Sequence, residues 1–158
     1  MINLIIKIPG RENIHIENII FDYNGTIAIN GKIKESIKES VKKLTTLYKV
    51  YVLTADTYKT AEKECKEIGI ILKTFPRENA GEFKKNILLE VGKTTTICVG
   101  NGFNDIKMCK ESILSIGVIE EEGMCSKLFL HTDIVVKSIE SALNILLDKN
   151  KIIATLRN

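Results

Sequence analysis

The chain has 158 residues, of which 44% are hydrophobic and 27% are charged, a composition typical of one globular domain with an ordinary core. Its formal net charge of +3 is too small to indicate a nucleic-acid partner. No apolar run reaches the roughly 18 residues of a membrane helix, and the N-terminus has no signal-peptide pattern. We therefore expect a cytoplasmic protein that binds no membrane.

The first part of the chain predicts a hairpin, a central strand and a helix. Residues 2–8 and 14–21 are apolar runs separated by the turn residues Pro9 and Gly10, so we expect an antiparallel hairpin, residues 1–18, that leads into the central strand. Residues 34–48 are expected to be helical, because four apolar residues at spacings of four, three and four share one face: Ile37, Val41, Leu44 and Tyr48.

After residue 48, short apolar runs alternate with helical patterns. We expect strands over residues 49–54, 70–75, 95–99, 112–118 and 133–136, and helices over residues 59–68, 79–90, 103–110, 124–130 and 139–147. The second of these helices is expected to bury Phe83, Ile87 and Leu88, and the tail, residues 149–158, to be a short strand or a frayed end. This alternation predicts a single α/β domain over residues 1–158, with a parallel sheet covered by helices on both faces.

Polar residues stand at the ends of several predicted strands, where open α/β folds bind their ligands. Asp22 ends the central strand, and Thr54 ends the next one. Lys84 and Lys85 lie early in a helix, and a glycine-rich loop, residues 100–105, follows a later strand. A strand-end carboxylate can act as a covalent nucleophile toward phosphorus.

Together these loops resemble the haloacid dehalogenase-like (HAD) superfamily, and most closely the phosphorylation domain of P-type ATPases and their small soluble relatives. P-type ATPases carry Asp-Lys-Thr-Gly-Thr, Leu-Thr-Gly-Asp and Gly-Asp-Gly-x-Asn-Asp, and here the same places read Asp-Tyr-Asn-Gly-Thr (22–26), Leu-Thr-Ala-Asp (53–56) and Gly-Asn-Gly-Phe-Asn-Asp (100–105). The resemblance spans residues 19–147 and implies a three-layer, Rossmann-like HAD fold.

The resemblance also implies a role for each site residue. Asp22 would be the nucleophile that becomes an aspartyl phosphate, with Thr54 and Lys84 as its catalytic partners. Phosphate would be bound by Thr54, Ala55, Lys84, Tyr23 and Asn24, and Mg²⁺ by Asp22, the backbone carbonyl of Asn24, Asn101 and Asp105. The loops would be supported by Gly25, Thr26, Gly100, Gly102 and Asn104.

The chain departs from the common hydrolase pattern at two positions. Asn24 stands where phosphatases carry the aspartate that protonates the leaving group and then activates water, a function worth about 10²–10⁴ in rate. Asn101 replaces a metal-binding aspartate, so Mg²⁺ is expected to bind more weakly. The spacing of the motifs leaves no room for a cap domain or for the nucleotide-binding domain of a P-type ATPase.

The sequence thus predicts a slow, Mg²⁺-dependent phosphohydrolase or phosphotransferase that acts on a phosphorylated small molecule or another phosphate ester. The two asparagines leave open a catalytically impaired binding or regulatory protein on the same scaffold. A phospho-receiver domain is disfavoured by the Gly25-Thr26 pair after the nucleophile, and the N-terminal hairpin could supply an oligomer surface.

Several single residues also keep a purely structural interpretation. Residues 22–25 could form a plain turn, and Thr54 or Asp56 could cap a helix. The site lysine could be Lys84 or Lys85, although the register back from Gly92 favours Lys84. The four cysteines lack a Cys-x-x-Cys pairing and are expected to be small buried hydrophobes: Cys65, Cys98, Cys109 and Cys125.

Overall fold

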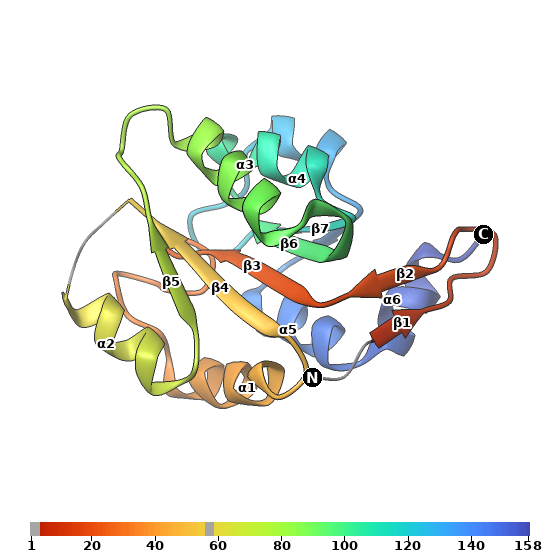
Figure 1. Ribbon diagram of the computed structural model, residues 1–158, viewed down its shortest axis with the longest axis horizontal. Helices are drawn as coiled ribbons and strands as arrows, with labels where there is room; N and C mark the ends of the chain where they lie inside the picture. The colour runs from red at the N-terminus through yellow and green to blue at the C-terminus, as the bar shows by residue number, and fades with distance from the viewer. Residues whose placement is uncertain (1–3, 56–58) are drawn as a thin grey trace.

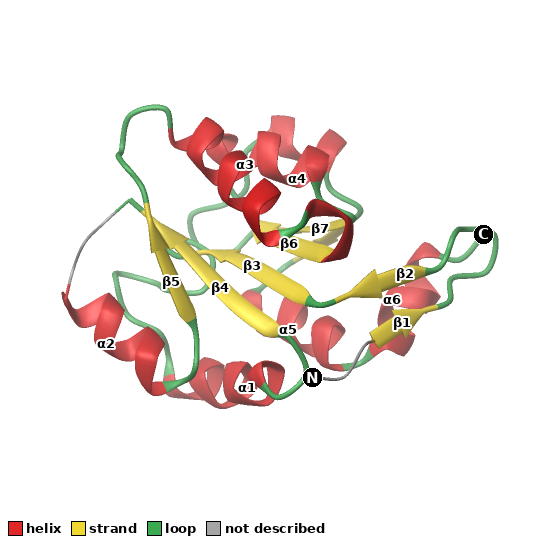
Figure 2. Ribbon diagram, in the orientation of Figure 1, coloured by secondary structure: helices red, strands yellow, loops and turns green. Residues whose placement is uncertain are grey.

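A parallel β-sheet forms the centre of the molecule in the computed structural model, which describes residues 4–55 and 59–158 (Figures 1 and 2). Its six strands lie in the order β5-β4-β3-β6-β7-β8. Their bounds are β3 Asn18–Asp22, β4 Lys49–Thr54, β5 Ile71–Thr74, β6 Thr96–Gly100, β7 Leu114–Val118 and β8 Ile134–Val136. Because β3 pairs with β4 on one side and β6 on the other, three of the predicted loops meet near one point of the carboxyl edge.

Helices cover both faces of this sheet, as predicted (Figure 1). One face carries α1, α2 and α5, which span Glu35–Thr45, Lys59–Glu67 and Ile139–Leu147. The other carries α3, Ala80–Val91, and α4, Ile106–Glu111. Short 3₁₀ turns, Lys93–Thr95, Phe103–Asp105 and Ser126–His131, complete the connections, so the helices expected over residues 103–110 and 124–130 are wholly or partly 3₁₀. No helix of the described residues is long and apolar enough to cross a membrane.

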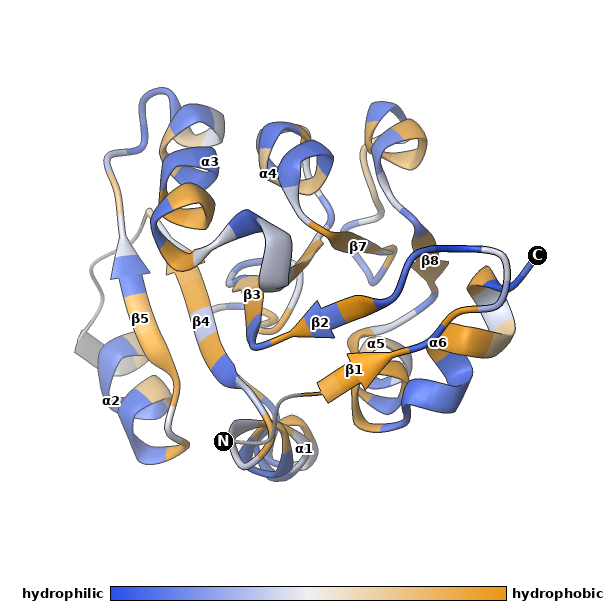
Figure 3. Cartoon of the chain, turned by 45° about the vertical axis from the view of Figure 1, so that its right-hand side comes forward, coloured by the Kyte–Doolittle hydropathy of each residue, from blue (hydrophilic) through white to orange (hydrophobic). Residues whose placement is uncertain are grey.

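The strict alternation of side chains along β3 divides the core into two parts. Ile19 and Phe21 join a large cluster under α1 and α5, whereas Ile20 joins a smaller cluster under α3 and α4. Asp22 has the same parity as Ile20 and therefore faces α3. The strands between the helical layers are predominantly hydrophobic (Figure 3). The same alternation that places apolar side chains in both clusters thus also directs the Asp22 carboxylate toward α3.

The predicted inner face of α1 is confirmed, although the helix ends at Thr45 and the buried Tyr48 follows it, whereas the prediction for α3 is partly wrong. On α1, Ile37, Val41 and Leu44 are buried. On α3, the buried residues are Lys84 and Leu88, whereas Phe83 is 39% exposed. The inward face of α3 is therefore set by a lysine, because the ammonium finds carboxylate partners inside the protein.

The N-terminal hairpin is confirmed as β1, Leu4–Ile6, paired antiparallel with β2, Ile14–Ile16. The prediction for the tail is wrong: it forms helix α6, Lys149–Leu156, which begins where Asp148 Oδ1 accepts a hydrogen bond from the Asn150 amide. Ile152 and Leu156, four residues apart on α6, are buried in the same cluster as the inner side chains of the hairpin. The Asn158 amide donates to the Pro9 carbonyl at 3.0 Å, so the helix and the hairpin turn are held together.

The contribution of α6 can be measured with one truncation. Ile152→Ala leaves a cavity between α6, α5 and the hairpin, and we expect it to lower the free energy of unfolding by about 2–4 kcal/mol. Urea denaturation followed by circular dichroism measures this loss. Leu130→Ala is the matched control, since its side chain is 87% exposed and its removal creates no cavity. Equal effects of the two truncations would contradict the packing of the tail as a core helix.

Candidate active site

The carboxyl edge of the sheet brings three of the predicted site residues together around the ammonium group of a fourth, Lys84. Lys84 Nζ donates to Asp22 Oδ1 at 2.8 Å, to Asp105 Oδ1 at 2.7 Å and to Asn104 Oδ1 at 2.8 Å. An ammonium has three donors, so all of them are used. The Lys84 side chain is only 2% exposed and the Asp105 side chain is fully buried, whereas 13% of the Asp22 side chain remains exposed. Of the carboxylates, Asp22 is thus the one that an external molecule can reach.

Asp105 is held from both sides. Its Oδ1 accepts from Lys84, and its Oδ2 accepts from the backbone amides of Asn101 and Gly102, each at 3.0 Å. A Cβ on Gly100 would lie 2.5 Å from the Asp105 carboxyl carbon, so only glycine leaves room for this carboxylate. Asp105 therefore fixes the turn after β6 and presents one oxygen to the lysine.

Asn101 connects three loops. Its Oδ1 accepts from Thr26 Oγ1 at 3.4 Å, and its Nδ2 donates to the Gly123 carbonyl at 3.3 Å. Its own carbonyl accepts from the Cys125 amide at 2.8 Å. A carboxylate at position 101 could not donate to Gly123, which gives the asparagine a structural reason for its place here.

The electrostatics of the cluster are unbalanced, because one ammonium faces two carboxylates. Burial, together with the charge of Asp105, raises the pKa of Asp22 to about 7, although Lys84 and the Tyr23 amide act in the opposite direction. Burial also tends to lower the pKa of Lys84, but the two carboxylates more than offset it and the pKa is raised. Lys84 thus stays charged, and its ammonium is one positive charge between two carboxylates.

A pocket of about 290 Å³ opens in front of Asp22. Thr54, Ala55 and Asn24 line it, as the sequence interpretation expected of a phosphate site, together with Asn104. The remaining lining residues were not predicted: Phe75, Arg77 and Ala80. Arg77 lies in the loop between β5 and α3, and its only sequence signal is a cation that follows a strand and Pro76.

The other predicted residues lie as follows. Tyr23 is buried, and both of its donors are used inside the protein, since its amide donates to the Leu53 carbonyl and its hydroxyl to the Gly31 carbonyl. We therefore leave Tyr23 out of the phosphate site. Lys85 points away and pairs with Glu82 at 3.3 Å, so Lys84 is the lysine that contacts the carboxylates. Asp56 lies outside the described residues.

Gly25 supports the turn after Asn24 through its left-handed backbone, with φ of 75°. A side chain there would also collide with the Glu122 carboxylate and the Asn101 amide. The expectation of buried cysteines is confirmed for Cys65, Cys98 and Cys109 but is wrong for Cys125, which is partly exposed.

Comparison with known structures identifies the fold. The cobalt-bound 3-deoxy-D-manno-octulosonate 8-phosphate phosphatase of Haemophilus influenzae superposes with a TM-score of 0.69 at 14% identity, over 86% of this chain and 89% of that one. The magnesium-, phosphate- and sugar-bound enzyme of Moraxella catarrhalis gives 0.64 at 15% identity, over 90% and 94%. A Legionella pneumophila protein described as an HAD-superfamily hydrolase gives 0.66 at 11% identity, over 89% and 87%. The fold is that of the HAD superfamily.

Sequence comparison adds nearer relatives. An uncharacterised Methanocaldococcus jannaschii protein is 48% identical over 62 residues, which are 39% of this chain and 67% of that protein. A second uncharacterised protein of the same organism is 51% identical over 39 residues, 25% of this chain and 89% of that one. The chain belongs to the same family as these two proteins. No protein-family model matches it.

The P-type ATPase likeness is also found by sequence, over a limited region. A copper-exporting P-type ATPase of Staphylococcus saprophyticus is 31% identical over 101 residues, which are 61% of this HAD-fold chain. The chain spans 12% of the length of that ATPase.

The donor set of this HAD-fold site suits a hard divalent cation. The two carboxylates outnumber the one ammonium, and the raised pKa of Asp22 reflects that imbalance. Among the described residues no three His, Cys, Asp or Glu side chains are grouped as a metal site. Carboxylate and amide oxygens are the donors that hard divalent cations prefer.

The charge imbalance has a measurable effect on stability. Because the pKa of Asp22 is higher in the folded protein than in the unfolded chain, the folded state loses stability as pH rises from about 4 to about 7. Asp22→Asn removes this loss and leaves Lys84 paired with Asp105. In EDTA we expect the variant to equal the wild type near pH 4 and to exceed it by about 1–3 kcal/mol at pH 8. Urea denaturation across this interval measures the difference, and parallel curves for the two proteins would contradict the raised pKa.

Proposed function

We propose that this chain is a phosphohydrolase or phosphotransferase that forms an aspartyl phosphate on Asp22. The observation that carries the proposal is the position of Asp22: its Oδ1 is fixed by Lys84 while the side chain opens into the pocket lined by Thr54 and Ala55. The fold of octulosonate 8-phosphate phosphatases supports the reaction class. The substrate would be a phosphorylated small molecule or another phosphate ester.

In the first step an Asp22 carboxylate oxygen attacks phosphorus, and the bond between phosphorus and the ester oxygen breaks. The leaving alkoxide takes its proton from water, because Asn24 carries no acid. Lys84 stabilises the anionic phosphoryl oxygens, and Thr54 donates a hydrogen bond to one of them. In the second step water attacks the aspartyl phosphate, inorganic phosphate leaves, and the Asp22 carboxylate is restored; an acceptor alcohol in place of water would give phosphotransfer.

Mg²⁺ would be held by Asp22, the Asn24 carbonyl and Asn101, with Asp105 behind them. When bound it would supply positive charge that offsets the repulsion between the carboxylate and the phosphate ester. Asp105 would act on the reaction mainly by orienting Lys84 and the loop at residues 100–105, because both of its oxygens are engaged there.

The absence of an acid at position 24 predicts slow turnover and a long-lived phosphoenzyme. Asn24 lies at the pocket and its side chain is exposed, so it stands beside the space that a leaving group would occupy. We further propose that the protein acts in the cytoplasm.

Hydrolysis of p-nitrophenyl phosphate in Mg²⁺ tests the proposal directly. We expect activity in the wild type that is lost with EDTA and is lowered at least ~10³-fold in Asp22→Asn and in Lys84→Met, since each removes a participant in the transition state. Lys85→Met is the matched control and should keep wild-type activity, because Lys85 points away from the carboxylates. The enzyme proposal fails if Asp22→Asn shows the same background rate as the wild type on p-nitrophenyl phosphate and on a panel of small esters.

A second experiment tests the cause of the slow turnover. Asn24→Asp supplies a general acid and base, and we expect it to raise steady-state hydrolysis at least ~10-fold and to shorten the life of the phosphoenzyme. Acid-quench trapping of phosphate on the protein measures that lifetime. An unchanged rate would show that metal or substrate binding limits turnover instead.

A binding or regulatory role is the alternative that Asn101 favours, because its amide is used to join three loops. Beryllofluoride with Mg²⁺ separates the two functions, since it mimics a phosphoryl group on aspartate. A beryllofluoride bonded to Asp22 in a crystal structure would support the enzyme. An Asp22 that stays unmodified, in a protein that still binds a protein partner, would support the alternative.

A further inference from the structure

A second and larger pocket adjoins the site. It has a volume of about 710 Å³, against about 290 Å³ for the pocket in front of Asp22, and Asn24 lines both. It lies between the loop at residues 30–32 and the helices α1 and α2. Volumes of roughly 300–1,000 Å³ are typical of small-molecule sites, so this pocket can take the non-phosphate part of a substrate.

Apart from Gly31, the described residues that line this pocket carry polar or charged side chains, although much of the surface they present is apolar. The lining consists of Asn24, Asn30, Gly31, Lys32, Lys38, Lys63, Glu64 and Glu67. Among the residues that the structure describes, no aliphatic or aromatic side chain lines this pocket. The amides of Asn24 and Asn30 can instead bind hydroxyl groups, because each amide both donates and accepts hydrogen bonds.

Two of the charged side chains in the pocket, Lys38 and Glu64, form contacts that stabilise its wall. Lys38 Nζ lies 3.4 Å from Glu64 Oε1, and Glu64 Oε2 accepts from the Ile33 amide at 3.3 Å. These contacts tie α1, α2 and the loop at residues 30–33 together. Lys38 and Glu64 are partly buried, so their pairing is less screened than an exposed pair.

Two lysines of the pocket lie outside this network, whereas Lys38 also lies 3.8 Å from Glu35 Oε2. Lys32 and Lys63 are exposed side chains that reach the pocket from opposite walls, the loop and α2, and only Glu67 opposes them. Among the described residues neither lysine takes part in a recorded ion pair. Lys32 and Lys63 therefore offer two ammonium groups on opposite walls, between which an anionic group of the substrate other than the transferred phosphate would lie.

We propose that this second pocket binds the leaving group, and that the substrate is a hydroxylated phosphate monoester with a second anionic group, such as a carboxylate. The phosphate would lie at Asp22 and the second anion between Lys32 and Lys63. This assignment rests on the proposed function, because it places the transferred phosphate at Asp22.

Two phosphate esters with the same carbon skeleton test the charge requirement. 3-Phosphoglycerate and glycerol 3-phosphate differ by a carboxylate in place of a hydroxymethyl group. Calorimetric titration into the full-length Asp22→Asn protein with Mg²⁺ measures binding without turnover. We expect 3-phosphoglycerate to bind about tenfold more tightly than glycerol 3-phosphate at low salt, and the preference to shrink in 0.5 M NaCl because exposed charges are screened.

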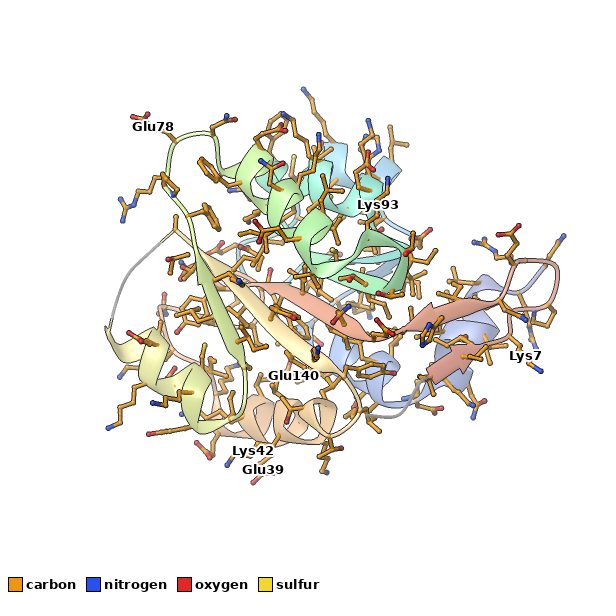
Figure 4. The ribbon with its side chains drawn as sticks, viewed as in Figure 1. Lys7, Glu39, Lys42, Glu78, Lys93 and Glu140 are labelled. Atoms are coloured by element: carbon orange, nitrogen blue, oxygen red, sulfur yellow. The ribbon has the colours of Figure 1, made fainter. Side chains whose placement is uncertain are left out.

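The lysines are then changed in the same background. Lys32→Gln with Lys63→Gln should abolish the preference for 3-phosphoglycerate, while Lys7→Gln with Lys149→Gln should keep it. Lys7 lies in the connection between β1 and β2 (Figure 4) and Lys149 begins α6, and both elements are at the end of the molecule opposite α2 (Figure 1). Circular dichroism confirms that both double variants are folded. Equal binding of the two esters, or a preference that survives Lys32→Gln with Lys63→Gln, overturns the assignment.

The two proposals fail separately. If the wild type hydrolyses no ester while the Asp22→Asn protein shows the lysine-dependent preference, the proposed phosphohydrolase activity is refuted, and the proposal that the second pocket binds an anionic group is supported. If the wild type hydrolyses p-nitrophenyl phosphate but the Asp22→Asn protein shows no preference for 3-phosphoglycerate, the proposed activity is supported and the assignment of the second pocket is refuted.

Discussion

The arrangement of the site depends on the ammonium of Lys84, which lies between two carboxylates inside the protein. A lysine that is 2% exposed would be costly to bury alone, and its three hydrogen bonds to Asp22, Asp105 and Asn104 make the burial acceptable. The same bonds set the rotation of α3 about its axis. Since Asp105 is itself held by two backbone amides, the lysine is anchored to the turn after β6 and holds Asp22 in one orientation. A nucleophile fixed in this way needs little rearrangement when its partner arrives.

The sheet supplies the rest of the geometry through its register. Asp22, Thr54 and Gly100 end three adjacent parallel strands, β3, β4 and β6, so their loops leave from one edge. The alternation of side chains along each strand then decides which face of the sheet each side chain points to. Ile20 and Asp22 share a side, as do Cys98 and Gly100, and the place where a side chain of residue 100 would stand is taken by the Asp105 carboxylate. Residues up to 83 positions apart along the chain thus meet without any specialised scaffold.

Much of this could be predicted from the sequence, because the strands are short apolar runs and the motifs stand directly at their ends. The central place of the strand that ends at Asp22 could be expected on that basis, and the register back from Gly92 favours Lys84 over Lys85. The inward face of α3 could not, since hydrophobic periodicity favours Phe83 and is blind to an ion pair formed with residues 22 and 105. Helix α6 was missed because its apolar face is short and is stabilised by the hairpin, whose residues lie more than 130 positions earlier. The position of Arg77 and the existence of the second pocket depend on the paths of loops, which the composition of the sequence does not predict.

The unequal division of the core bears on how this protein can evolve. The larger cluster, under α1, α5 and α6, contains most of the buried apolar side chains and lies largely on the face of the sheet opposite α3 and α4. The smaller cluster beneath α3 and α4 supports the charged residues. Substitutions that alter specificity in the loops at the edge therefore act on a framework whose folding is secured on the far side, and such a division lets new chemistry be explored without loss of the native state.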